Sequence, residues 1–475
     1  MYIETHGCLD RGVPAALHGR PLYDLLLRAP PQDAVRSAAA QCVRQELQRV
    51  QRRPCQLPDD PGALGGWMQA SAHAVHAAYR HYLGERKAGA PRRYFGNRAH
   101  ALYFLHTVAP TKLVDGAWLY GLVEHWQNPR FADLVRTYVE ELGEGGARGN
   151  HVLLYRALLA RHGLEQIDDL ADEQYLQGTL QLALGWNAQE FLPEIIGFNL
   201  GYEQLPLHLL ITAYELNELG LDPYYFTLHA TVDNADTGHA RRACQAVLDN
   251  LPRVADGGAF WARVREGSKL AGAGPGTNDL ITGFDIGREV LRVFERKAGA
   301  GAGAHSDYCR VAGRSINEWL SVPKELPAFL QVLQDTGWIR RGEAAECSRF
   351  WGLLQGPRAE MFGVFSGYEL QLIHDWIRGD VASADGRSYR DAGKLGAGSK
   401  VPTFRVAARR PEALGDPLAD AELLDPDLDS FKAHLAGLDA AGRVKALVQA
   451  MSPAHHWTPM GLYATRLFCE ASDHP

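Results

Sequence analysis

The chain is long, mixed in composition and slightly acidic. At 475 residues it exceeds the size at which one hydrophobic core usually keeps growing, so two or three domains are expected. Hydrophobic residues make up 46% and charged residues 22% of the chain, which is typical of a soluble globular protein. The net charge of −7 excludes the basic surface that binding to nucleic acid or to a membrane surface needs.

Targeting signals and cysteine pairs are not apparent in the sequence. The N-terminal stretch MYIETHGCLDRG has no charged segment followed by an apolar one, so no signal peptide is expected. The apolar runs fall far short of the roughly 20 residues that a transmembrane helix needs. Seven scattered cysteines without a CxxC pair exclude a disulfide framework or a zinc–thiolate site as the main theme. These features predict a cytoplasmic protein.

Helical periodicity dominates the chain, and alternating strand patterns are scarce. From the N-terminus, the spacing of apolar residues predicts helices over 34–53, 65–83, 102–126 with a break at Pro110, 131–142, 151–163, 173–185, 189–219, 258–270 and 278–296. The connections are short and no fixed repeat is present. The predicted fold class is therefore an all-α helical bundle.

The chain divides into three predicted regions. The Gly- and Ala-rich segment 297–305 predicts a flexible connector. Before it, we expect an N-terminal helical extension over 1–92 and a central bundle over 93–297. After it, helical patterns return, and they predict a helical C-terminal domain over 305–475.

The segment PYYFTLHATVDNADTGHARRA, at 223–243, carries an unusual set of polar side chains. On a helix, His229, Asp233 and Asp236 fall within an arc of ~60°. His239 projects from nearly the same side. Such a stripe is a poor core face, because charged groups are rarely buried unless they are paired or bound to a metal. It predicts one wall of a metal site.

Other segments offer further metal ligands. Glu141 ends one predicted helix and His151 begins the next, and the glycines of GEGGARGN between them let both side chains turn towards one point. Glu203 lies in an apolar and aromatic run, where a lone carboxylate needs a partner. Asp115 is a possible extra carboxylate, although its position favours an acid at a helix N-terminus.

The order of EELGEGGARGNHVLLY, EIIGFNLGYEQLP and YFTLHATVDNADTGHA resembles the heme-oxygenase-like diiron oxidases and oxygenases, also described as iron-containing redox enzymes. In that family one helix pair supplies a glutamate and, ten residues later, a histidine. A middle helix supplies a second glutamate, and a third supplies His-x3-Asp-x2-His. The resemblance covers approximately 102–251 and implies a heme-oxygenase-like bundle. It also implies these metal ligands: Glu141, His151, Glu203, His229 and Asp233.

This chain departs from the family pattern at the last ligand position. Asp236 stands where the family has a histidine, and His239 follows three residues later. Either Asp236 ligates instead, or the helix unwinds or bulges near Gly238 and brings His239 in.

The resemblance implies two ferrous ions (Fe2+) as cofactor and dioxygen as co-substrate. It implies an oxidase or oxygenase that acts on a small amine, amino acid or fatty-acid-like molecule in specialised metabolism. It implies no catalytic residue beyond the metal ligands. It leaves room for an external electron donor and for a homodimer, with no nucleic acid or membrane as partner.

An alternative function is a non-catalytic metal-binding or partner-docking helical scaffold, because residues 305–475 show no comparable chemistry. A heme site is disfavoured, since the stripe is crowded with carboxylates where a porphyrin wants one histidine and apolar walls. Cys244 lacks the surroundings that would activate a nucleophilic thiol. We expect Arg242 on a solvated face, and His456 in packing or capping.

Overall fold

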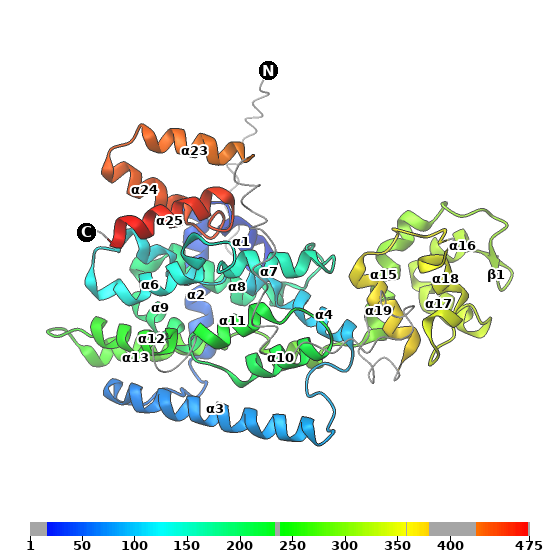
Figure 1. Ribbon diagram of the computed structural model, residues 1–475, viewed down its shortest axis with the longest axis horizontal. Coiled ribbons are helices and arrows are strands. Elements are labelled where there is room, and N and C mark those ends of the chain that lie inside the picture. The colour runs from blue at the N-terminus through cyan, green and yellow to red at the C-terminus, as the bar shows by residue number, and fades with distance from the viewer. Residues whose placement is uncertain (1–16, 233–237, 358, 380–423, 474–475) are drawn as a thin grey trace.

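The computed structural model of the chain describes residues 17–232, 238–357, 359–379 and 424–473, and over these residues the fold is almost entirely helical (Figure 1). Two short strands, β1 (Arg310–Val311) and β2 (Arg314–Ser315), pair antiparallel, with Arg310 opposite Ser315 and Val311 opposite Arg314. The predicted all-α class is confirmed. Within the described residues, no helix combines the length and the apolar character needed to cross a bilayer.

The helices follow one another with short connections. The α-helices up to residue 232 are α1 (Gly19–Leu26), α2 (Asp33–Val50), α3 (Leu64–Lys87), α4 (Arg98–Thr107), α5 (Ala109–Lys112), α6 (Ala132–Glu141), α7 (His151–Ala160), α8 (Leu176–Trp186), α9 (Ala188–Tyr202), α10 (Leu207–Glu218) and α11 (Tyr224–Val232). Those after it are α12 (His239–Asn250), α13 (Gly257–Leu270), α14 (Thr277–Thr282), α15 (Ile286–Gly301), α16 (Ile316–Leu320), α17 (Leu326–Asp335), α18 (Arg349–Gln355), α19 (Gly367–Arg378), α23 (Pro426–Ala436), α24 (Ala440–Ala450) and α25 (Pro459–Asp473). The 3-10 helices are η1 (Pro61–Ala63), η2 (Ala117–His125), η3 (Pro129–Phe131), η4 (Gly143–Gly145), η5 (Asp172–Tyr175), η6 (Pro323–Glu325) and η7 (Ala345–Cys347).

Three hydrophobic clusters organise these helices. The first joins α1, α2, α6, α8, α9, α12 and α13, and it also takes in α24 and α25. The second lies among α4, α7, α10 and α11. The third belongs to α15–α19, which form the separate group of helices on one side of Figure 1. The described part of 305–475 thus contributes to the first hydrophobic cluster, through α24 and α25, and to the third, through α16–α19. The predicted domain boundaries stay a prediction.

The expectation of one helical run over 189–219 is wrong. Helix α9 ends at Tyr202, and α10 begins at Leu207, directly after Pro206. Proline has no backbone N–H, and it disfavours the helical conformation at the residue before it. The break places Glu203 at the end of a helix instead of in the middle of one.

The expectation of a flexible connector over 297–305 is wrong in its first part. Helix α15 continues to Gly301. Ala298 is buried in the third hydrophobic cluster together with Val293 and Phe294. Because alanine is the best helix former and its side chain is packed here, the helix extends into the Gly- and Ala-rich segment.

Helix α9 lies very close to α13. A Cβ atom on Gly197 would lie 1.9 Å from the carbonyl oxygen of Val264, so only glycine permits this approach. The contact fixes the position of α9. It thereby fixes Glu203, the residue that caps the C-terminal end of α9.

A buried carboxylate fastens the chain that leads into α4. Glu215 on α10 is fully buried. It accepts hydrogen bonds from the Tyr82 hydroxyl (2.7 Å) and from the backbone N–H groups of Arg93 (2.5 Å), Tyr94 (3.0 Å) and Phe95 (2.9 Å). Four donors satisfy the charge of this carboxylate, so α3, α10 and the start of α4 are held together at one point.

Glu215→Ala is expected to lower the free energy of unfolding by about 3 kcal/mol, because it leaves several buried donors without an acceptor. Glu215→Gln should cost less, since the amide oxygen still accepts. Glu218→Ala is the matched control: Glu218 pairs with Arg86 at 2.7 Å and its side chain is 25% exposed, so its loss should cost under about 1 kcal/mol. Urea unfolding measures all three, and equal losses at both positions would contradict the assignment.

Candidate metal centre

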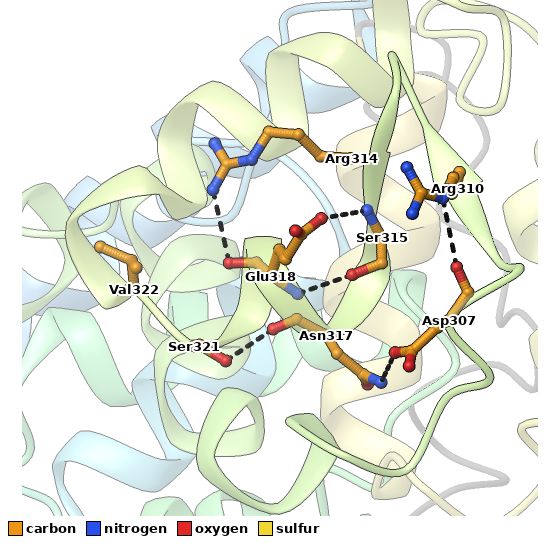
Figure 2. Close-up of a pocket in the computed structure, with 8 residues that line it drawn as sticks. All are labelled: Asp307, Arg310, Arg314, Ser315, Asn317, Glu318, Ser321 and Val322. Carbon is orange, nitrogen blue, oxygen red and sulfur yellow. Dashed lines mark hydrogen bonds between the residues drawn. The ribbon is translucent and has the colours of Figure 1, made fainter.

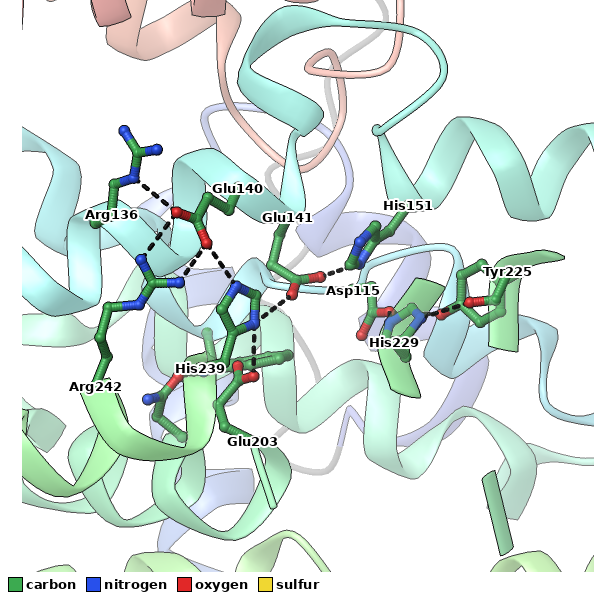
Figure 3. Close-up of polar contacts among 12 residues, drawn as sticks. Asp115, Arg136, Glu140, Glu141, His151, Glu203, Tyr225, His229, His239 and Arg242 are labelled. Carbon is green, nitrogen blue, oxygen red and sulfur yellow. Dashed lines mark hydrogen bonds and ion pairs between the residues drawn. The ribbon is translucent and has the colours of Figure 1, made fainter. Parts of the chain in front are cut away.

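A tight glycine turn brings Glu141 and His151 together. Gly143 has a φ of +63°, and a Cβ atom there would lie 2.3 Å from the backbone nitrogen of Asn150. Leu142 and Asn150 form a β-bridge across the turn. The chain therefore folds back on itself between α6 and α7. Glu141 at the end of α6 faces His151 at the start of α7 (Figure 3).

The first of two buried polar groups contains four side chains whose ligand atoms all lie within 4.8 Å of one another: Asp115, Glu141, His151 and His229. The Nε2 atom of His229 lies 3.0 Å from Oδ2 of Asp115. The Nδ1 atom of His229 lies 2.9 Å from the carbonyl oxygen of Tyr225 and donates to it. This backbone bond orients the ring so that Nε2 faces the centre of the group.

The second buried group contains Glu141, Glu203 and His239, again within 4.8 Å of one another. The Nδ1 atom of His239 lies 2.9 Å from Oε2 of Glu203 and 3.4 Å from Oε1 of Glu141. Glu141 is therefore a member of both groups, with one oxygen towards His151 and the other towards His239 (Figure 3).

Two atoms at the centre of this cluster have no hydrogen bond. Glu141 Oε2 and His151 Nδ1 are both buried and touch each other, but their geometry does not make a hydrogen bond, and neither finds another partner. Buried polar atoms are normally satisfied. Two lone-pair-bearing atoms that converge on one point without bonding fit a shared cation, and the carboxylate and imidazole donors suit a transition metal.

Electrostatics keeps the carboxyl groups ionised. Burial alone would raise the pKa of Asp115, but the Lys112 ammonium and the hydrogen bond from His229 hold that pKa well below its usual range. Burial likewise acts to raise the pKa of Glu141, and the neighbouring His151 outweighs it and lowers the pKa. Ionised carboxylates are the form that binds metal.

Glu140 supports His239 from behind. The Nε2 atom of His239 lies 2.9 Å from Oε2 of Glu140. Arg242 donates to both oxygens of Glu140, and Arg136 donates to Oε1 at 2.7 Å. The expectation that Arg242 lies on a solvated face is wrong, since its side chain is 21% exposed and is committed to this pair. Glu140 was not predicted from the sequence, because its neighbour Glu141 matched the family motif.

The structure brings together five of the predicted residues: Glu141, His151, Glu203, His229 and His239. The remaining two, Asp233 and Asp236, lie outside the described residues. Of the two alternatives at the last ligand position, the interrupted helix agrees with the structure, since Gly238 is extended (φ −83°, ψ −167°) and α12 begins anew at His239. The expectation for Asp115 is corrected: it faces His229 inside the cluster.

The C-terminal helices hold the turn between α6 and α7. Asn150 donates to the carbonyl oxygen of His456 (3.2 Å), and Arg466 donates to that of Gly145 (2.8 Å). The Tyr138 hydroxyl on α6 donates to the carbonyl oxygen of Met451 (2.6 Å). His456 therefore serves packing, as predicted, and the segment around α25 is part of the support of the cluster.

A hollow of about 580 Å³ lies elsewhere, beside β1, β2 and α16 (Figure 2). Its charged side chains already have partners: Arg314 pairs with Glu325 at 2.6 Å, and Glu318 closes a capping box with Ser315. This hollow belongs to the group of helices around the third hydrophobic cluster, and it contains none of the residues of the two buried groups.

Residues 102–272 match the family model described as iron-containing redox enzyme. Over that stretch the match confirms the resemblance inferred from the three motifs. It includes every residue of the two buried groups. Comparison with curated proteins and with solved structures gives no significant match.

Asp115 governs the protonation of His229 in the metal-free protein. Burial lowers the pKa of His229, but the hydrogen bond and the charge of Asp115 outweigh it and raise the pKa to about 9, from a usual 6.5. Protonated His229 therefore contributes about 3 kcal/mol to the free energy of unfolding. This contribution is fully present below pH 6.5 and is lost as the pH rises through 9. In Asp115→Asn, burial dominates, so the pKa of His229 should fall below its usual value. Histidine NMR titration measures both, and an unchanged pKa in the variant would refute the assignment.

Proposed function

We propose that the chain, whose residues 102–272 match the iron-containing redox enzymes, is a non-heme diiron oxidase or oxygenase that uses dioxygen. Its substrate is a small amine, amino acid or fatty-acid-like molecule of specialised metabolism. The observation that carries the proposal is the carboxylate of Glu141, which belongs to both buried groups of possible metal ligands. A carboxylate placed between two ligand groups is the arrangement that a bridged pair of ions needs.

Each group holds one ion in this proposal. One ion is held by Asp115, Glu141, His151 and His229, and the other by Glu141, Glu203 and His239. The carboxylates of Asp233 and Asp236 complete the proposed ligand set. When bound, the ferrous pair supplies electrons and open coordination positions to dioxygen.

The donor atoms favour iron over the alternatives. Mixed carboxylate and imidazole ligands suit ferrous iron, whereas thiolate ligands would select zinc or an iron–sulfur cluster. A heme would need one axial histidine and apolar walls. The cluster instead buries three carboxylates, those of Asp115, Glu141 and Glu203.

The chain's own residues orient the ligands and manage protons. The Tyr225 hydroxyl donates to Oδ2 of Asp115 at 2.5 Å, which fixes that carboxylate and holds a proton beside the first group. His229 keeps its Nδ1 proton on the Tyr225 carbonyl and so offers Nε2 to the ion. Because these residues are buried, bulk water is kept away from the reacting positions.

The proposal extends to the partners of the enzyme. Electrons come from an external donor, and the protein acts in the cytoplasm, as a homodimer in its simplest form. The competing proposal is a non-catalytic metal-binding or partner-docking helical scaffold. It differs in one respect that experiment detects, because a scaffold consumes no dioxygen.

The purified protein, loaded anaerobically with ferrous iron, is expected to bind two ions per chain and to consume dioxygen when reduced. Glu141→Ala should lose both ions, because this carboxylate serves both groups. Glu203→Ala and His229→Ala should each lose one. Elemental analysis and an oxygen electrode measure these results.

Glu124→Ala is the control, because Glu124 is exposed and should leave two ions bound. A wild-type protein that binds no iron would overturn the proposal. Two ions without oxygen consumption would favour the scaffold, and a Soret band after addition of heme would favour a heme protein.

Glu140→Gln is expected to weaken the binding of one of the two ions by about 10- to 100-fold, because the support of His239 changes from a charged acceptor to an amide. Anaerobic titration with ferrous iron measures the number of ions bound per chain and the affinity of each. Glu194→Gln is the matched control: Glu194 is a buried carboxylate paired with Arg263 through both oxygens at 2.6 and 2.7 Å. Its loss should reduce stability and leave iron affinity unchanged. Equal iron binding in wild type and Glu140→Gln would contradict the role of Glu140.

A further inference from the structure

Arg156 is a half-buried cation without a counter-charge. It lies on α7, five residues after His151. Its guanidinium carbon is 3.8 Å from the centre of the Trp457 ring, so the group is stacked on the indole. Its Nε atom is buried and makes no hydrogen bond. Stacking leaves the edge of the guanidinium, which carries the N–H donors, free of the ring.

In the part of the chain that the structure describes, no carboxylate forms an ion pair with this guanidinium. Burial lowers the pKa of Arg156, and the one group that acts in the opposite direction is the hydroxyl of Tyr23. Buried cations are normally paired, because removing them from water is costly. By contrast, the arginines beside the hollow of Figure 2 are satisfied, with Arg310 donating to two carbonyl oxygens and Arg314 paired with Glu325.

The hydroxyl of Tyr23 is a second unsatisfied group in the same place. Tyr23 on α1 is 2% exposed, and its hydroxyl makes no hydrogen bond. Its ring packs edge-on against Tyr175, with centroids 5.3 Å apart, which fixes the position of the hydroxyl oxygen. Tyr23 lies within electrostatic range of Arg156. A buried hydroxyl without a partner is uncommon, because its desolvation is uncompensated.

His456, which precedes Trp457, is a neutral neighbour of Arg156 and does not compensate its charge. Asn150 donates to its Nδ1 atom at 3.1 Å, so the neutral ring carries its proton on Nε2. Burial and the charge of Arg156 lower the pKa of His456 to about 3, which keeps the ring neutral. Within the described residues, α1, α7 and the segment before α25 thus contribute the unbonded Tyr23 hydroxyl, the Arg156 guanidinium and the neutral His456 ring to this place.

We infer that Arg156 and Tyr23 form a binding site for an oxyanion, either a carboxylate or a phosphate. The guanidinium edge matches the two oxygens of such a group, and the tyrosine hydroxyl adds a further donor. Because Arg156 remains partly exposed, an anion can reach it.

The site lies next to the candidate metal centre. His456 bonds to Asn150, and Asn150 precedes His151 of the first group. An anion at Arg156 would anchor a substrate whose reacting part extends towards His151. This role in substrate binding rests on the proposed function, whereas the binding of an anion does not.

The test uses the full-length, metal-free protein, so that its outcome is independent of iron binding. Isothermal titration with octanoate and with inorganic phosphate, at constant ionic strength, gives the affinity for each probe. Arg156→Met should weaken binding tenfold or more. Arg156→Lys should be intermediate, because an ammonium does not form the two-pronged contact.

Tyr23→Phe removes only the hydroxyl and keeps the ring, so a severalfold loss in this variant cannot be attributed to unfolding. Arg161→Met is the control at the C-terminal end of α7, since Arg161 already pairs with Asp222 at 2.6 Å. Binding of octanoate alone would identify a carboxylate site, and binding of phosphate alone a phosphate site. Binding of neither probe, or equal binding by wild type and Arg156→Met, would overturn the inference. Failure of iron binding with intact anion binding would count against the proposed function alone.

Discussion

The structure depends on the burial of three carboxylates at one point, with Glu141 shared between two groups. Carboxylates removed from water must be matched by positive charge. In the metal-free chain, part of the matching charge comes from the proton on His229 and from Lys112, which lies 4.0 Å from Asp115. Metal ions bound as proposed would replace protons at ring nitrogens, so metal binding would be coupled to proton release.

The geometry around Glu141 is set from outside the segment that matches the family model. That match ends at residue 272, yet the turn between the first two proposed ligands is held by the segment before α25 and by α25 itself. Arg466 bonds to Gly145, and His456 accepts from Asn150. In this chain the C-terminal segment thus stabilises the turn that places Glu141 and His151. This explains why α24 and α25 share the first hydrophobic cluster with α6 and α9.

Local signals predicted the helices and most of the cluster. The 3.6-residue periodicity is a local property, and so are the glycine turn before His151 and the isolated acid Glu203 in an apolar run. The sequence left two alternatives at the last ligand position, and the extended Gly238 before α12 agrees with the one in which the helix is interrupted and His239 joins the cluster. Tertiary packing decides the contacts of Asp115, Arg242 and His456. Some of these contacts join residues about 300 positions apart in the chain, and no spacing in the sequence encodes them.

The two groups differ in what lies behind them. The first is backed by Tyr225 and by Asn150, both part of the interior, and through Asn150 it adjoins the inferred anion site at Arg156. The second is backed by Glu140 and Arg242, whose side chains are 22% and 21% exposed. The residues that back the second group are therefore partly exposed to solvent, whereas those that back the first group are buried. An anion bound at Arg156, as inferred above, would lie beside the first group, whereas the partly exposed Glu140–Arg242 pair backs the second.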